Sequence, residues 1–141
     1  MNWIGVGIAV VGVTVLGVIA IPGLKLARMT ANEAGARKSL LLINAAEVNF
    51  AKLHPDQGYA CSLRELGMAN QREGYLFEIS DCEPQAPNKA YRVSARPAVK
   101  DQTGYWAFCS DEGGVIKGSS ESVEDCRAAG VALTPNRDHI D

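Results

Sequence analysis

The chemistry that this sequence supports best is disulfide formation among its four cysteines, Cys61, Cys82, Cys109 and Cys126. None of them forms a C-x-x-C pair, so their spacing gives little support to a zinc site. An even number of well-separated cysteines in a small domain is typical of two disulfides formed outside the cytosol. Of the three possible connectivities we expect the pairing of sequence neighbours, Cys61 with Cys82 and Cys109 with Cys126. The alternative is four buried free thiols in a cytosolic domain.

Residues that would catalyse a reaction or bind a metal are few. His54 and His139 are isolated in the sequence, and each is typical of a surface histidine. Asp111 and Glu112 in "SDEGG" are candidate calcium ligands, but their spacing fits no calcium-binding loop and favours a solvated turn. The sequence contains no glycine-rich phosphate loop, no G-x-S-x-G and no H-E-x-x-H. We therefore expect no enzyme activity, no metal and no cofactor.

The charged residues are confined to one part of the chain. The 141 residues carry a net charge of −2, with 47% hydrophobic and 21% charged residues, which is typical of a folded protein. Every Asp, Glu, Lys and Arg lies at or beyond Lys25, and no basic cluster is longer than Arg37-Lys38. This distribution provides no basic surface for nucleic acid, so we expect none as a partner.

The N-terminal segment predicts a membrane helix. Residues 3–22, "WIGVGIAVVGVTVLGVIAIP", contain no ionisable side chain. At about 1.5 Å per residue, a helix over this segment is about 30 Å long, which matches the hydrocarbon core of a bilayer. Trp3 and Lys25 at its two ends are typical of a membrane interface. We expect a retained anchor over residues 1–23, and a secretory signal cleaved at Val18-Ile19-Ala20 is the alternative.

Two features disagree about the side of the membrane on which the rest of the chain lies. Lys25 and Arg28, directly after the anchor, favour a cytoplasmic body by the positive-inside rule. The four cysteines favour an oxidising compartment. We give more weight to the cysteines and expect the body outside the cytosol.

The helix is expected to continue as an amphipathic segment over residues 24–54, after a kink at Pro22, and to end at His54-Pro55. One apolar stripe of this segment is expected to pack on the sheet, and it consists of Ile43, Ala46, Phe50 and Leu53. The residues expected on the opposite side are Arg37, Asn44 and Glu47.

The remaining chain, residues 55–141, predicts a small sheet. Four segments have strand composition: 74–80, 90–99, 104–110 and 114–118. Within the second segment Tyr91, Val93 and Ala95 alternate with polar residues, so we expect them on one apolar face of the sheet. Ser62 and Glu65 form a capping-box pattern that predicts a short helical turn, and the polar tail over residues 119–141 is expected to be loop-like. The predicted fold class is therefore α+β, with a long N-terminal helix packed on an antiparallel sheet of about four strands. Its parts are the anchor (1–23), the amphipathic continuation (24–54) and a disulfide-bearing head (55–141).

Together these segments resemble the type IV pilins and the pseudopilins of type II secretion systems. The uncharged helix is followed by "AIPGLKLARMTANEA", in which Ala20-Ile21-Pro22 stands at the family's usual distance from the mature N-terminus. "INAAEVNFAKLHPDQGYACSLRELG" is similar to the sequence after that helix in a bacterial pilin-like subgroup, and "FCSDEGGVIK" is similar to its last hairpin. The resemblance covers most of the chain and implies a pilin-like fold with the N-terminus inside and the head outside the cytosol.

The chain departs from the family pattern at its N-terminus. Family members are made with a short basic leader and usually carry a glutamate at the fifth mature position, whereas here Met1 stands at the first mature position and Gly5 at the fifth. In the family that carboxylate is thought to meet a neighbour's N-terminal amine, since an unpaired carboxylate within a bilayer is costly. Two interpretations stay open: a membrane-held relative that does not polymerise, and a mature chain whose leader is not shown.

The function that the resemblance implies is structural. The subunit is expected in the inner membrane, with its head in the periplasm or in an extracellular filament. It would assemble with copies of itself or with other pilin-like subunits into a type IV pilus or a secretion pseudopilus. The residues expected in the bundle of helices are Ile8, Val11, Val15, Val18 and Ile19, with Pro22 setting the bend. A membrane-tethered binding module that does not polymerise is the alternative, and Gly5 favours it.

Overall fold

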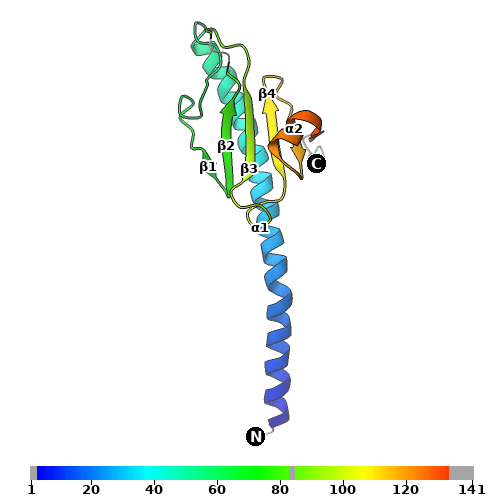
Figure 1. The fold of residues 1–141 in the computed structure, drawn as a ribbon. Coiled ribbons are helices and arrows are strands. Elements are labelled where there is room, and N and C mark those ends of the chain that lie inside the picture. The colour runs from blue at the N-terminus through cyan, green and yellow to red at the C-terminus, as the bar shows by residue number, and fades with distance from the viewer. Residues whose placement is uncertain (1–2, 83–84, 134–141) are drawn as a thin grey trace, which may run out of the picture.

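The computed structural model describes residues 3–82 and 85–133, with side chains from Pro22 onward. One helix, α1 (Trp3–Leu53), carries an α+β head on its C-terminal half (Figure 1). α1 is continuous through Pro22, in agreement with the prediction of a proline inside the helix. It ends before His54-Pro55, as predicted, because the residue before a proline disfavours the helical conformation.

The sheet is antiparallel, and its six strands lie side by side in chain order. They are β1 (Gln71–Arg72), β2 (Tyr75–Ser80), β3 (Arg92–Pro97), β4 (Ala107–Asp111), β5 (Lys117–Ser119) and β6 (Val131–Ala132). β2 to β5 correspond to the four predicted strands, so the expected number of about four is too low. β1 and β6 have two residues each, and so short a strand leaves no alternation of side chains by which the sequence would reveal it.

A second helix, α2 (Val123–Ala129), lies in the tail that the sequence predicts to be loop-like, so the prediction is wrong there. Ser122 caps this helix, because its side-chain Oγ accepts a hydrogen bond from the backbone N–H of Asp125 at 3.1 Å. Seven residues make only two turns, which is too short for an apolar period to be recognised in the sequence.

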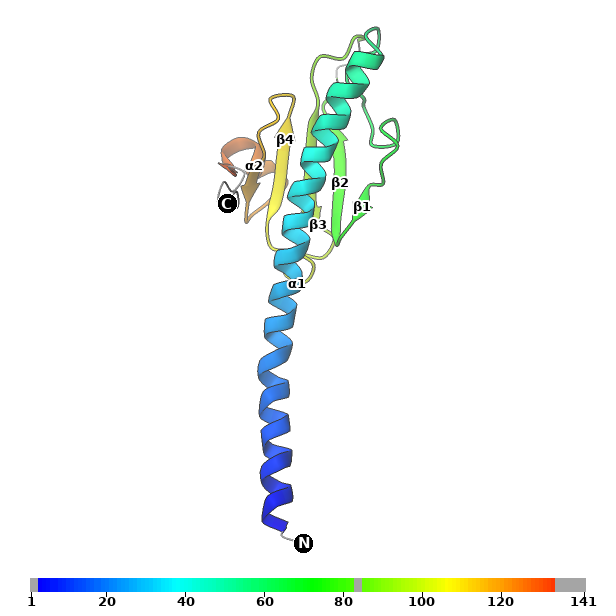
Figure 2. The same cartoon turned by 180° about the vertical axis from the view of Figure 1, so that it is seen from behind.

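The sheet lies between the two helices. The C-terminal half of α1 runs along one face, against β3 and β4, and α2 packs on the other face (Figures 1 and 2). The core between α1 and the sheet contains Ala36, Leu40, Ile43, Tyr75, Phe77, Tyr91, Val93, Ala95, Phe108 and Ile116. Tyr91, Val93 and Ala95 are all buried, which confirms the alternation seen in the sequence.

The predicted helix-to-sheet stripe agrees with the structure over part of its length. Ile43 is buried, Ala46 and Phe50 are half-buried, and Leu53 is 68% exposed. The prediction is wrong for Leu53, because ten residues after Ile43 an α-helix has turned to about 80° from the position of Ile43. Leu53 is also the last residue of α1.

Two polar residues of α1 lie on the buried side of the helix instead of the opposite side. The exposed fraction is 8% for Asn44 and 0% for Glu47, whereas Arg37 is exposed as predicted. Hydrophobic periodicity assigns polar residues to solvent. That assignment is wrong here because each side chain has a polar partner. The sheet supplies one to Asn44, and the loop after α1 supplies one to Glu47.

The N-terminal half of α1 extends away from the head (Figure 1). From Pro22 to Ala31 every side chain is exposed except that of Met29, and Leu24 and Leu26 are 62% and 65% exposed. Among the described residues, no helix combines the length and the apolar character that a membrane span requires. The structure describes no side chains before Pro22, so the predicted membrane span stays a prediction. The same holds for the predicted bundle residues, which are Ile8, Val11, Val15, Val18 and Ile19.

Candidate functional site

The head begins where Asn32 and Glu33 of α1 hold the loop between β3 and β4. The Nδ2 of Asn32 donates to the carbonyl oxygen of Thr103 at 2.8 Å. The Oε1 of Glu33 accepts hydrogen bonds from the backbone N–H groups of Tyr105 at 2.8 Å and Trp106 at 3.3 Å. Side chains of α1 therefore fix this loop at the end of the head from which the helix projects (Figure 2).

The middle of the head is joined to α1 by a buried hydrogen-bond chain. The hydroxyl of Tyr91 donates to the Oδ1 of Asn44 at 3.0 Å, and the Nδ2 of Asn44 donates to the Oγ of Ser110 at 2.9 Å. Burial raises the pKa of Tyr91 well above its ordinary value, so its hydroxyl keeps the proton that it donates. The pair of bonds satisfies both ends of the Asn44 amide within the core.

The upper end of the head is joined to α1 through Glu47. Its Oε2 accepts a hydrogen bond from the backbone N–H of Ala60 at 2.8 Å, in the loop that follows the helix. Its Oε1 is buried and has no hydrogen-bond partner among the described residues. Burial raises the pKa of Glu47 from 4.5 to about 7, and the nearby carboxylate of Glu65 adds to this rise, whereas the Ala60 N–H opposes it.

The capping-box prediction is confirmed at the level of its hydrogen bonds. The Oε2 of Glu65 accepts from the backbone N–H groups of Cys61 at 2.7 Å and Ser62 at 3.0 Å, and the backbone N–H of Glu65 donates to the Oγ of Ser62 at 3.4 Å. Residues 63–67 form turns instead of a regular helix. Gly67 ends them with a φ of +68°, which a glycine adopts without strain.

Both predicted disulfides are present with the expected pairing. Cys61 and Cys82 join the loop after α1 to the segment after β2, with their Cα atoms 5.6 Å apart. Cys109 and Cys126 join β4 to α2, with their Cα atoms 6.1 Å apart. The two bridges differ in access: Cys61 is exposed, whereas Cys109 and Cys126 are 4% and 0% exposed. The second bridge therefore holds α2 on the outer face of the sheet, buried between the two.

The candidate calcium ligands lie in a tight turn. The Oδ1 of Asp111 accepts the backbone N–H of Gly113 at 2.9 Å, and the carbonyl of Asp111 accepts that of Gly114 at 2.8 Å. Glu112 is exposed. In the part of the chain that the structure describes, no group of three or more His, Cys, Asp and Glu side chains is placed to hold a metal ion.

Among the described residues, no contact brings His54 together with an acidic or nucleophilic side chain. His54 is exposed, and its ring lies against that of Phe50, with ring centroids 4.4 Å apart. His139 lies outside the described residues.

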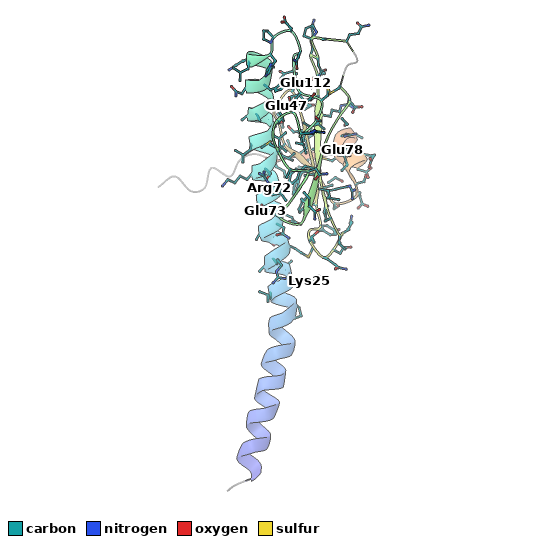
Figure 3. The ribbon with its side chains drawn as sticks, turned by 90° about the vertical axis from the view of Figure 1, so that its left-hand side faces the viewer. Lys25, Glu47, Arg72, Glu73, Glu78 and Glu112 are labelled. Atoms are coloured by element: carbon teal, nitrogen blue, oxygen red, sulfur yellow. A yellow bond between two sulfur atoms is a disulfide. The ribbon has the colours of Figure 1, made fainter. Side chains whose placement is uncertain are left out.

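A polar groove of about 550 Å³ lies on the outer face of the sheet beside α2. Figure 3 labels Glu78, one of its lining residues, on the side of the sheet away from α1. Its charged lining residues are Arg96, Lys100 and Arg127 together with Glu78, Glu121 and Glu124. The opposite charges balance, so the groove has no electrostatic preference for an anion or a cation.

The sequence contains a signal for the polar contacts of α1 that hydrophobicity alone does not use. Leu40 and Glu47 are seven residues apart, which is close to two helical turns, so Glu47 lies on the same face as a core leucine. A polar residue in register with an apolar face indicates a buried polar contact when the helix packs on a sheet. Its partner, the Ala60 N–H, is a backbone group and has no sequence signal.

No family model matches the chain, and neither does any curated protein or solved structure. A proposal for its function therefore depends on the chain's own residues and their geometry. The features that bear on it are the projecting half of α1, the polar contacts that hold the head on α1, and the two disulfides.

Proposed function

We propose that this chain is a structural, pilin-like subunit that is anchored in a membrane by the N-terminal half of α1. Its head would lie outside the cytosol, and the projecting helix would assemble with other copies or other pilin-like subunits into a type IV pilus or a secretion pseudopilus. The observation that carries this proposal is the continuity of α1: one helix supports the head with its C-terminal half and projects from it with the other half (Figure 1).

From Pro22 to Ala31 of the projecting half the described residues leave every side chain except that of Met29 exposed, and Leu24 and Leu26 are largely exposed. The sequence before it, residues 3–22, contains no ionisable side chain. Apolar side chains of this kind are stable only when they are covered, first by lipid and then by neighbouring helices. A membrane and neighbouring helices would provide that cover.

The disulfides support an extracytoplasmic head. Cys109 and Cys126 form a buried bridge between β4 and α2, and Cys61 and Cys82 close a loop at the distal end of the head. Bridges of this kind form and persist in oxidising compartments. The α+β arrangement, a helix packed along an antiparallel sheet, is also the arrangement that the pilin resemblance implies.

A membrane-tethered module that does not polymerise is the second candidate, and Gly5 favours it. In the family that the chain resembles, a carboxylate at this position is thought to pair with a neighbour's N-terminal amine, and a glycine supplies no such group. The two candidates share the anchor and the head, and they differ only in contacts between helices of neighbouring copies.

Assembly is tested by cross-linking the full-length chain in its membranes. A double variant, Ile8→Cys with Val18→Cys, places two thiols among the predicted bundle residues, and the two single variants are its matched controls. Under mild oxidation we expect a ladder of trimers and longer species from the double variant and nothing beyond dimers from either single variant. Monomers and dimers alone from the double variant would contradict assembly and leave the tethered module.

The anchor is tested separately, by N-terminal sequencing of the chain and by alkaline extraction of the membranes. A retained anchor keeps residues 1–23 on the chain and keeps the chain in the membrane pellet. A chain that starts near Ile21 and is released by extraction would contradict both candidates.

A further inference from the structure

Two carboxylates hold three consecutive backbone N–H groups at the distal end of the head. Glu47 of α1 accepts from Ala60, at 2.8 Å. Glu65 accepts from Cys61 and Ser62, at 2.7 and 3.0 Å. We call this arrangement, Glu47 and Glu65 with the amides of residues 60–62, the carboxylate clamp. It ties the loop that follows α1 back onto the helix.

The two acids of the carboxylate clamp differ in their surroundings. Glu47 is 0% exposed, and Figure 3 labels it on the upper part of α1, where the helix meets the sheet. Glu65 is exposed to solvent. An ionised Glu65 is therefore hydrated, whereas an ionised Glu47 would be a buried charge with one oxygen unpartnered among the described residues. A neutral Glu47 leaves only a hydroxyl in that position, which costs less free energy than a charged oxygen.

The titratable groups that face Glu47 do not offset its charge. The turn after residue 60 presents Glu65, a second acid. The segment before β3 presents Tyr91, which Tyr59 contacts edge-on with ring centroids 4.9 Å apart. Asp111, the last residue of β4, and Glu112 directly after it are acids that also raise the pKa of Tyr91. The ion pairs among the described residues join Asp81 to Arg92 and to Arg127, and Glu47 takes part in neither of them.

We propose that Glu47, buried with one carboxylate oxygen unpartnered among the described residues, makes the carboxylate clamp sensitive to pH: the clamp is closed while Glu47 is protonated and opens as Glu47 ionises. The opened segment is the loop over residues 54–62, which is also tied to Cys82 by a disulfide. The change is therefore local to the end of the head farthest from the projecting helix (Figure 1). The proposal concerns the head alone and holds for either candidate function.

The direction of the effect follows from proton linkage. Burial raises the pKa of Glu47 from 4.5 to about 7 in the closed clamp, and its pKa returns to about 4.5 once the opened loop exposes the carboxyl to solvent. The closed state thus binds the proton more tightly. Its extra stability is complete below pH 4.5 and is lost as the pH rises from there through about 7. Mildly acidic surroundings close the clamp, and alkaline ones open it.

Hydrogen exchange of the full-length chain in detergent, followed by mass spectrometry, measures this opening. Peptides that cover residues 55–62 are compared at about pH 5.5 and about pH 8, after correction for the intrinsic effect of pH on exchange. For the wild-type chain, linkage predicts that opening of this segment increases roughly 30-fold between the two conditions. Peptides from β3 and β4 serve as an internal control and should change much less.

Two variants separate the roles of the acids. Glu47→Gln keeps the size and the acceptor oxygen of the side chain but cannot ionise, so exchange in residues 55–62 should lose its pH dependence. Glu65→Gln is the matched control: it removes an exposed acid from the same clamp, and the pH dependence should remain. The proposal is overturned if the wild-type segment shows no pH-dependent opening, or if Glu47→Gln retains it.

A direct titration covers the case in which Glu47→Gln does not fold. The carboxyl carbon of Glu47 in the wild-type chain is followed by NMR as the pH is raised. A midpoint near 7 supports the proposal, and a midpoint near 4.5 contradicts it. These measurements do not depend on filament formation, so their failure is distinct from a failure of the proposed function.

Discussion

The hydroxyl of Tyr91 donates a hydrogen bond to the side-chain oxygen of Asn44 at 3.0 Å, inside the core between α1 and the sheet. Asn44 in turn donates to Ser110 of β4 at 2.9 Å. All three residues are less than 10% exposed. One asparagine therefore links the helix to β4 and to the segment directly before β3, and it can do so only when α1 has the right rotation and the right height. The contact fixes the position of the head along the helix.

Replacement of Tyr91 by phenylalanine tests this contact. Tyr91→Phe keeps the ring and removes the donor, which leaves the buried Oδ1 of Asn44 unpaired. We expect the free energy of unfolding of the full-length chain in detergent to fall by about 1–3 kcal/mol, measured by denaturant titration. Tyr105→Phe is the control, since Tyr105 is 45% exposed, and it should change stability by less than about 0.5 kcal/mol. Equal losses from both variants would contradict the role given to Asn44.

The buried face of α1 is tested by a pair of truncations. Ile43 is 3% exposed and Leu53 is 68% exposed. Ile43→Ala leaves a cavity in the core, and we expect a loss of about 2–4 kcal/mol. Leu53→Ala removes a solvated side chain at the end of the helix and should cost less than about 0.5 kcal/mol. The same denaturant titration measures both, and a larger effect at Leu53 would mean that the buried face is misplaced.

The two disulfides should differ in their rate of reduction in the folded protein. A reductant reaches the exposed Cys61 directly, whereas Cys109 and Cys126 are both buried. With a limiting reductant we expect the Cys61–Cys82 bridge to open at least about tenfold faster, because the attacking thiolate must reach a sulfur. Alkylation followed by peptide mass spectrometry measures both rates. In denaturant the two rates should converge, and equal rates in the folded state would contradict the difference in access.

Gly58 is required by a close approach of two backbone segments. Its φ is +78°, and a Cβ at this position would overlap the carbonyl oxygen of Asn88. Gly67 has a similar φ of +68° but open space around it, so it is the matched control. Gly67→Ala should cost only the backbone strain, about 1–2 kcal/mol. Gly58→Ala should cost about 1–3 kcal/mol more, because the Asn88 backbone must move as well. Similar losses of stability from the two variants would show that the Asn88 backbone moves away from residue 58 at little cost in free energy.

The parts of this fold that were predicted from the sequence are those in which the hydrophobic period of a helix or a strand recurs several times. The helix over residues 24–53 and the alternation of Tyr91, Val93 and Ala95 each extend over several periods of one secondary structure. β1, β6 and α2 could not be predicted, because they are two to seven residues long and depend on contacts with a neighbouring strand or on a disulfide.

The buried polar contacts of α1 were harder to predict, for a different reason. Glu47 and Asn44 were expected in solvent because their types are polar. Their burial depends on partners that are far away in the sequence, the Ala60 amide, Tyr91 and Ser110. A pattern within one helix carries no information about acceptors and donors on the elements that will cover it.

The way the head is attached to α1 determines how the molecule would respond to mechanical force. Both disulfides lie within the head, so the only covalent route from α1 to the sheet is the main chain beyond Leu53, at the distal end. Tension applied to the projecting end of the helix would load the contacts from Asn32 to Glu47 in shear, along strands that run beside the helix (Figure 2). Contacts loaded in shear share the force and must break together, whereas contacts that are peeled apart break one after another.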